Sequence, residues 1–140
     1  MDYAKQTGSC GIDCFNCELH EANADTDARR AVDERVPQLA GVTCKGCREQ
    51  GGCVLSSAPC ATRECAESKG VSFCFECTDF PCERLNPTAD GASRYPHNLK
   101  IYNLCRMKAV GIDAWAKEAA AIRARYFKGT FRLGDAPQAD

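Results

Sequence analysis

Residues 65–85 carry four cysteines in one short run, and this density most constrains what the chain can fold into. Two of them, Cys74 and Cys77, form a Cys-x-x-Cys pair that can hold one metal ion from a tight turn. Cys65 and Cys82, at short offsets on either side, can complete a tetrahedron. The run therefore predicts a metal-binding core with these four cysteines as ligands. The competing arrangement, in which the pair meets cysteines of another cluster, requires closing a longer loop at a greater entropic cost.

Short helices are expected on both sides of the pair. Thr62 is placed to cap a helix that carries Cys65 and ends at Gly70. Thr78 or Asp79 is placed to cap a second short helix, with Pro81 and Cys82 in its first turn. A thiol in the first turn of a helix ionises more easily, because the helix dipole favours the thiolate that binds metal.

Two further cysteine clusters precede this run. The first has the spacing Cys-x3-Cys-x2-Cys and is followed by His20. The second begins with a Cys-x-x-Cys pair that contains Gly46. The flexible glycine lets backbone amides point at the sulfurs. The predicted metal ligands in all three clusters are Cys10, Cys14, Cys17, Cys44, Cys47, Cys60, Cys65, Cys74, Cys77 and Cys82, with Cys53 and His20 as secondary candidates.

Twelve cysteines in a 140-residue chain could also form disulfides. Residues 1–9 lack the apolar stretch of a secretory signal, and three Cys-x-x-Cys pairs suit metal better than disulfides, so we expect metal ligation and a cytoplasmic location. The expected metal is zinc, as two or three ions, held in closed thiolate sites. An iron–sulfur cluster is the alternative, and a reactive surplus thiol is a third reading.

The remainder of the chain predicts mostly helical structure in a single domain. Residues 19–36 read as one or two short helices, and residues 96–109 and 114–127 as an αα-hairpin packed on the cysteine-rich core. We expect the metal core to span residues 10–86, the helical hairpin residues 96–128, and a flexible tail residues 134–140. The predicted inner faces of the hairpin contain Leu99, Tyr102, Cys105, Ala109, Trp115, Ala119 and Ile122 or Arg123.

These motifs together resemble a family of small cysteine-rich bacterial and archaeal proteins known as domain of unknown function 3795. The matching residues are Cys10-Gly11-Ile12-Asp13-Cys14 with Cys17, Cys44-x-Gly46-Cys47-Arg48, Arg63-Glu64-Cys65-Ala66, Lys69-Gly70-Val71-x-Phe73-Cys74-x-x-Cys77, Phe80-Pro81-Cys82-Glu83-x-Leu85, His97-Asn98-Leu99 and Gly111-Ile112-Asp113-Ala114-Trp115. The resemblance implies a metal-binding protein and no assigned activity.

Function is therefore expected to lie in binding. The chain shows no nucleotide-binding loop, nucleophile triad or carboxylate dyad, so no catalytic residue is predicted. From Arg94 onward it has nine Lys or Arg against four Asp or Glu. A basic segment can contact nucleic acid, but the simpler interpretation is that it packs against the acidic front part. We expect a protein partner, with nucleic acid as the alternative and no membrane.

Overall fold

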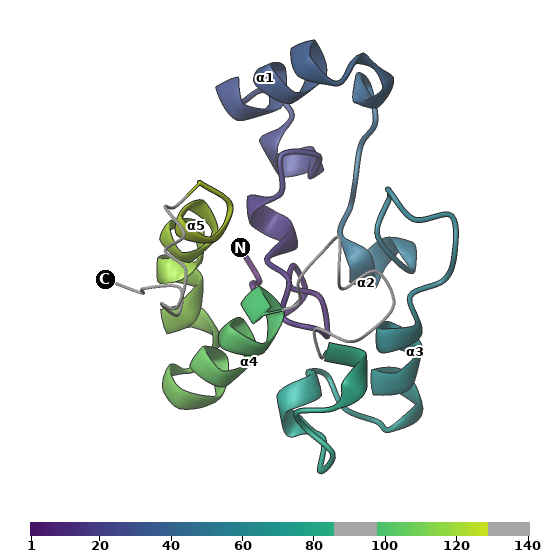
Figure 1. Ribbon diagram of the computed structural model, residues 1–140, viewed down its shortest axis with the longest axis vertical. Helices are drawn as coiled ribbons and strands as arrows, with labels where there is room; N and C mark the ends of the chain where they lie inside the picture. The colour runs from purple at the N-terminus through teal and green to yellow at the C-terminus, as the bar shows by residue number, and fades with distance from the viewer. Residues whose placement is uncertain (86–97, 129–140) are drawn as a thin grey trace, which may run out of the picture.

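The computed structural model describes residues 1–85 and 98–128, and this part of the chain is mostly helical and contains no β-strand (Figure 1). Its α-helices are α1 (Asp27–Arg35), α2 (Cys47–Gln50), α3 (Ala61–Ser68), α4 (Asn98–Val110) and α5 (Ile112–Lys128). Its 3-10 helices are η1 (Cys14–Asn16), η2 (Glu21–Asn23), η3 (Pro37–Leu39), η4 (Cys74–Glu76) and η5 (Glu83–Leu85). The predicted helical class is confirmed.

Helices α4 and α5 form the predicted αα-hairpin and lie side by side in Figure 1. Gly111 separates them, and its N–H donates to Met107 O at 2.8 Å. Helix α5 begins two residues before the predicted start at residue 114, so Asp113 lies inside it, and the N–H of Trp115 donates to Gly111 O. The predicted helix start at residue 96 and the predicted tail both fall outside the described residues.

The inner face of the hairpin covers the cysteine-rich part of the chain. Trp115, which is fully buried, meets Phe15 of the first cluster edge to face at a centroid distance of 5.8 Å. The buried core joins hairpin and cluster residues: Cys10, Phe15, Phe73, Leu85, Leu104, Met107, Trp115, Ala116 and Ala119. Apolar burial against the clusters thus holds the hairpin in place.

The predicted inner face of α4 is partly wrong. Leu99 is buried, but Tyr102, Cys105 and Ala109 are exposed. Buried positions recur from Leu99 at four-residue steps, at Asn103 and Met107, and Leu104 is buried beside them. Asn103 is the polar member of this set. The Asn103 side chain accepts a hydrogen bond from the Trp115 indole and donates another to Gly11 O. These hydrogen bonds offset the cost of burying a polar amide.

Helix α1 lies away from the hairpin at the far end of the molecule in Figure 1. Thr26 caps it by accepting from the N–H of Arg29. The prediction of one or two short helices over residues 19–36 is confirmed, since η2 and α1 both lie in this range. Arg29 is only 5% exposed, and its guanidinium donates to Val42 O and Leu39 O. These hydrogen bonds join α1 to residues 39–42, so the segment between the first two cysteine clusters is held together by its own contacts.

Candidate metal centre

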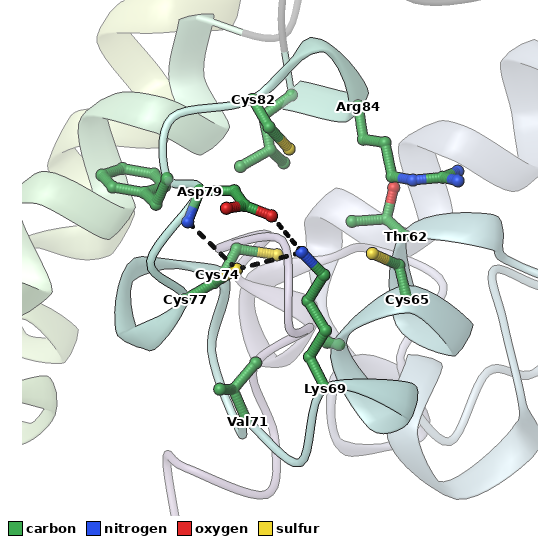
Figure 2. A pocket seen from close by; sticks show the side chains of 12 residues that line it. Thr62, Cys65, Lys69, Val71, Cys74, Cys77, Asp79, Cys82 and Arg84 are labelled. Carbon is green, nitrogen blue, oxygen red and sulfur yellow. Dashed lines mark hydrogen bonds and ion pairs between the residues drawn. The ribbon is translucent and has the colours of Figure 1, made fainter.

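The four cysteines of the central run surround one cavity of about 290 Å³ (Figure 2). Cys65 comes from α3, Cys74 and Cys77 from the two ends of η4, and Cys82 from the turn before η5. Within residues 1–85 and 98–128, however, no three His, Cys, Asp or Glu side chains lie close enough to hold one ion. The cavity thus gathers the four predicted ligands without drawing them to a single point.

The helices that carry these thiols differ from prediction at their starts. Cys60 occupies the N-cap of α3, so Thr62 lies inside the helix and Cys65 lies beyond its first turn. The second helix is the short η5, which begins after Pro81 and Cys82. The helix-dipole argument for Cys65 therefore fails, and the thiols depend on other donors.

Cys77 has two such donors. The backbone N–H of Asp79 lies 3.4 Å from its sulfur, and the Lys69 ammonium lies 3.6 Å from it. Lys69 also forms an ion pair with Asp79, and this hydrogen bond raises the pKa of Lys69 while lowering that of Asp79. Figure 2 shows the ammonium between the Asp79 carboxylate and the Cys77 thiol. A cation thus already lies among the thiols.

The pKa of the Cys74 thiol indicates why positive charge is needed among the thiols of the cavity. Burial, and after it the charges of four neighbouring cysteines, raise the pKa of this thiol to about 12: Cys10, Cys82, Cys65 and Cys77. Ionising all four thiols of the cavity therefore requires compensating positive charge. A thiolate donor set of this kind suits zinc, copper(I) or iron–sulfur centres.

Aromatic side chains and a hydrogen-bonded turn support the cavity. Phe80 lines it, and Phe73 and Phe75 stack with ring centroids 5.5 Å apart beside Cys74. The Glu76 carboxylate accepts from the N–H groups of Ser72 and Phe73, at 2.7 and 3.0 Å, which holds the start of η4. The sequence predicted no role for Glu76 or Lys69, and for Asp79 only a role as a helix cap; a charge within a few residues of each cysteine was the only available signal.

The first two clusters meet each other. Cys14 Sγ and Cys47 Sγ lie 3.7 Å apart, although the residues are far apart in sequence. The hydrogen bond between the two thiols, outweighing burial, lowers the pKa of Cys14 to about 6 while the pKa of Cys47 rises. At Cys44 the N–H of Gly46 lies 3.4 Å from the sulfur, which is the amide–sulfur contact predicted for this pair.

A short parallel bridge sets the two clusters in register. The N–H of Cys44 donates to Leu19 O at 2.8 Å, and the N–H of Glu21 donates to Cys44 O at 2.9 Å. Cys17 lies on this side, near Cys44, Arg123 and Glu18, and burial raises the pKa of its thiol. All twelve cysteines lie in the described part of the chain, and all are free thiols.

His20 and Cys53, the secondary ligand candidates, are placed less favourably for binding metal than the other cysteines. His20 is buried; its Nδ1 accepts from the N–H of Ala22, and its Nε2 lies 2.7 Å from Gln6 Oε1. Both ring nitrogens are therefore engaged, which leaves no lone pair for a metal in this arrangement. The side chain of Cys53 is exposed.

Comparison with known families gives one match. Residues 6–87 match the family described as "Protein of unknown function (DUF3795)". The chain belongs to this family. The matched region contains every predicted metal ligand and ends before α4 and α5. No curated protein and no solved structure matches the chain.

Among the described residues, no helix is both long enough and apolar enough to cross a membrane.

Proposed function

We propose that the protein is a small metal-binding protein whose central cavity holds a zinc ion on Cys65, Cys74, Cys77 and Cys82. Four thiolates leave a zinc ion no open coordination position, so its role is to stabilise the fold and not to activate a substrate. On this proposal the protein acts as a binding module. The observation that carries it is the gathering of four cysteines from three short elements around one cavity.

Two features of the cavity support a cationic centre. The Asp79 N–H already donates to Cys77 Sγ, the kind of contact that stabilises a thiolate ligand. The Lys69 ammonium at the same sulfur offsets negative charge, as a tetrathiolate zinc centre with a net double negative charge requires. Both features come from residues next to the ligands and not from the ligands themselves.

An iron–sulfur cluster is the second candidate, and the spread of the thiols favours it. No three of the described thiols close on one point, and the cavity of about 290 Å³ exceeds what one ion needs. A four-iron cluster places its four cysteines farther apart than a single ion does, because each cysteine sulfur binds a different iron atom.

Metal analysis of the full chain, purified without oxygen, separates these candidates. We expect a colourless protein with zinc bound in proportion to the chain. A brown protein with iron and sulfide in proportion would exclude zinc and favour the cluster. Protein that is folded and free of both metals would contradict the proposed function altogether.

Paired substitutions then locate the centre. Cys74→Ser combined with Cys77→Ser is expected to remove about one metal ion per chain, because two of four ligands are lost. Cys105→Ser is the matched control, since Cys105 is exposed on α4 and lies outside the cavity. Unchanged metal content in the double variant would show that the cavity is not the site.

A further inference from the structure

Two cysteines outside the central cavity already meet where the first two clusters come together. Cys14 Sγ lies 3.7 Å from Cys47 Sγ, and the two residues are 33 positions apart in the sequence. Both are free thiols; Cys14 is buried and Cys47 is half-buried. A sulfur–sulfur bond measures about 2.0 Å, so the two sulfurs need to approach by only about 1.7 Å to become bonded.

We propose that Cys14 and Cys47 form a disulfide that hydrogen peroxide closes and a dithiol reductant reopens. This redox site is independent of the proposed function, because neither residue lines the central cavity. The junction of the first two clusters is then a site of reversible oxidation, and its chemistry needs no metal ion.

Main-chain contacts on both sides of Cys47 hold its segment against the first cluster. Three residues before it, the N–H of Cys44 donates to a carbonyl of the first cluster at 2.8 Å. One residue after it, Arg48 Nε donates to Thr7 O at 2.7 Å. The position of Cys47 beside Cys14 therefore does not depend on a bond between the two sulfurs.

Gly46 is a second, independent sign of the close approach. Its φ of +92° lies in the left-handed region that favours glycine, and a Cβ built on it would lie 3.7 Å from Cys14 Cβ. The main chain next to Cys47 thus lies against the side chain of Cys14. Two thiols held side by side react with each other far faster than separate molecules do, because their encounter is already arranged.

The oxidation takes two steps. In the first, one sulfur of the pair attacks an oxygen of hydrogen peroxide: an S–O bond forms, the O–O bond breaks, and the leaving hydroxide takes the thiol proton and departs as water. In the second, the other sulfur attacks the sulfenic acid: the S–S bond forms, the S–O bond breaks, and hydroxide leaves with the second thiol proton as water. A dithiol reductant reverses the result by exchange, becoming a disulfide itself and returning one proton to each sulfur.

The test treats the reduced full-length chain with one equivalent of hydrogen peroxide, blocks the remaining thiols and maps linked peptides by mass spectrometry. Trypsin cleaves after Lys45 and Arg48, so Cys47 is the only cysteine in its peptide, and fragmentation identifies the cysteine joined to it. We expect Cys14 as the main partner and a chain lighter by two hydrogen atoms. Treatment with dithiothreitol should remove the link.

Two controls separate this contact from random oxidation. Cys17→Ser is expected to keep the link and Cys14→Ser to abolish it, with emission of the buried Trp115 reporting whether each variant folds. The wild-type chain unfolded in guanidinium chloride should instead distribute Cys47 over several partners. Should Cys14→Ser fail to fold, the wild-type peptide map still decides, since it names the partner directly.

Three results would overturn the proposal. Cys47 could be recovered unlinked, or linked mainly to a cysteine other than Cys14; its partners could be the same in the folded and the unfolded chain; or dithiothreitol could fail to restore the thiols. Zinc counted in the same reduced samples bears only on the central cavity, so either proposal can fail while the other stands.

Discussion

At the scale of single residues, Gly11 decides how closely α4 approaches the first cysteine loop. Its φ of +86° lies in the left-handed region, and a Cβ there would lie 2.8 Å from both Leu104 Cγ and Lys100 O. Its carbonyl accepts from Asn103, which also binds Trp115. The loop between Cys10 and Cys14 can therefore contact the helix only because residue 11 has no side chain.

Gly11→Ala is accordingly expected to destabilise the protein by about 2–4 kcal/mol, the sum of backbone strain and overpacking. Urea unfolding followed by Trp115 emission measures it. Gly41→Ala is the matched control: its φ is +78°, but no atom lies within 4 Å of the added Cβ, so only the backbone cost remains. Equal losses in the two variants would show that the close approach to α4 contributes nothing.

At the scale of elements, an ion pair joins the two helices of the hairpin. Arg106 of α4 donates from Nε and Nη2 to the two carboxylate oxygens of Glu118 of α5, at 2.9 and 2.7 Å. This hydrogen bond lowers the pKa of Glu118. Because the folded-state pKa is depressed, the stabilisation is present above the pKa of the unfolded chain and is lost as pH falls through the folded-state value.

The pH dependence of Glu118→Gln tests this interaction. The variant is expected to melt below the wild type near neutral pH, and the difference should vanish at about pH 3, where the glutamate is protonated. Thermal unfolding at both pH values provides the measurement. Glu49→Gln serves as control, because Glu49 has only a 4.0 Å contact with Lys45 on an exposed surface. A difference that persists at low pH would show that packing, and not charge, is responsible.

At the scale of the whole molecule, Arg48 ties the three cysteine-rich segments together. Its Nε donates to Thr7 O at 2.7 Å, its Nη2 donates to Ser72 O at 2.6 Å, and its guanidinium lies 4.7 Å from the centre of the Phe73 ring. It follows Cys47 directly, so one side chain of the second cluster holds both the N-terminal loop and the central run.

Arg48→Lys is expected to cost about 1–3 kcal/mol, since a single ammonium cannot replace two directed hydrogen bonds and a stacked guanidinium. Denaturant unfolding gives the loss in stability. Arg35→Lys, at an exposed position in the last turn of α1, is the control and should change little. If both variants behave like the wild type, the three segments are held by other contacts.

Several features of the protein could be read from the sequence because they depend on neighbours in the chain. The αα-hairpin follows from helical periodicity and from Gly111 between two such stretches. The gathering of Cys65, Cys74, Cys77 and Cys82 around one cavity follows from short loops, whose closure costs little entropy. Gly46 gives the amide–sulfur contact at Cys44 for the same local reason.

Other features were decided only by the tertiary structure. The approach of Cys14 to Cys47, the buried face of α4 through Asn103, and the engagement of both His20 nitrogens each depend on segments far apart in sequence. No spacing predicts such contacts, because a polar residue is buried only where a distant partner satisfies its hydrogen bonds. The helix face at Asn103 therefore turned toward Gly11 and Trp115, leaving Tyr102 and Cys105 exposed to solvent.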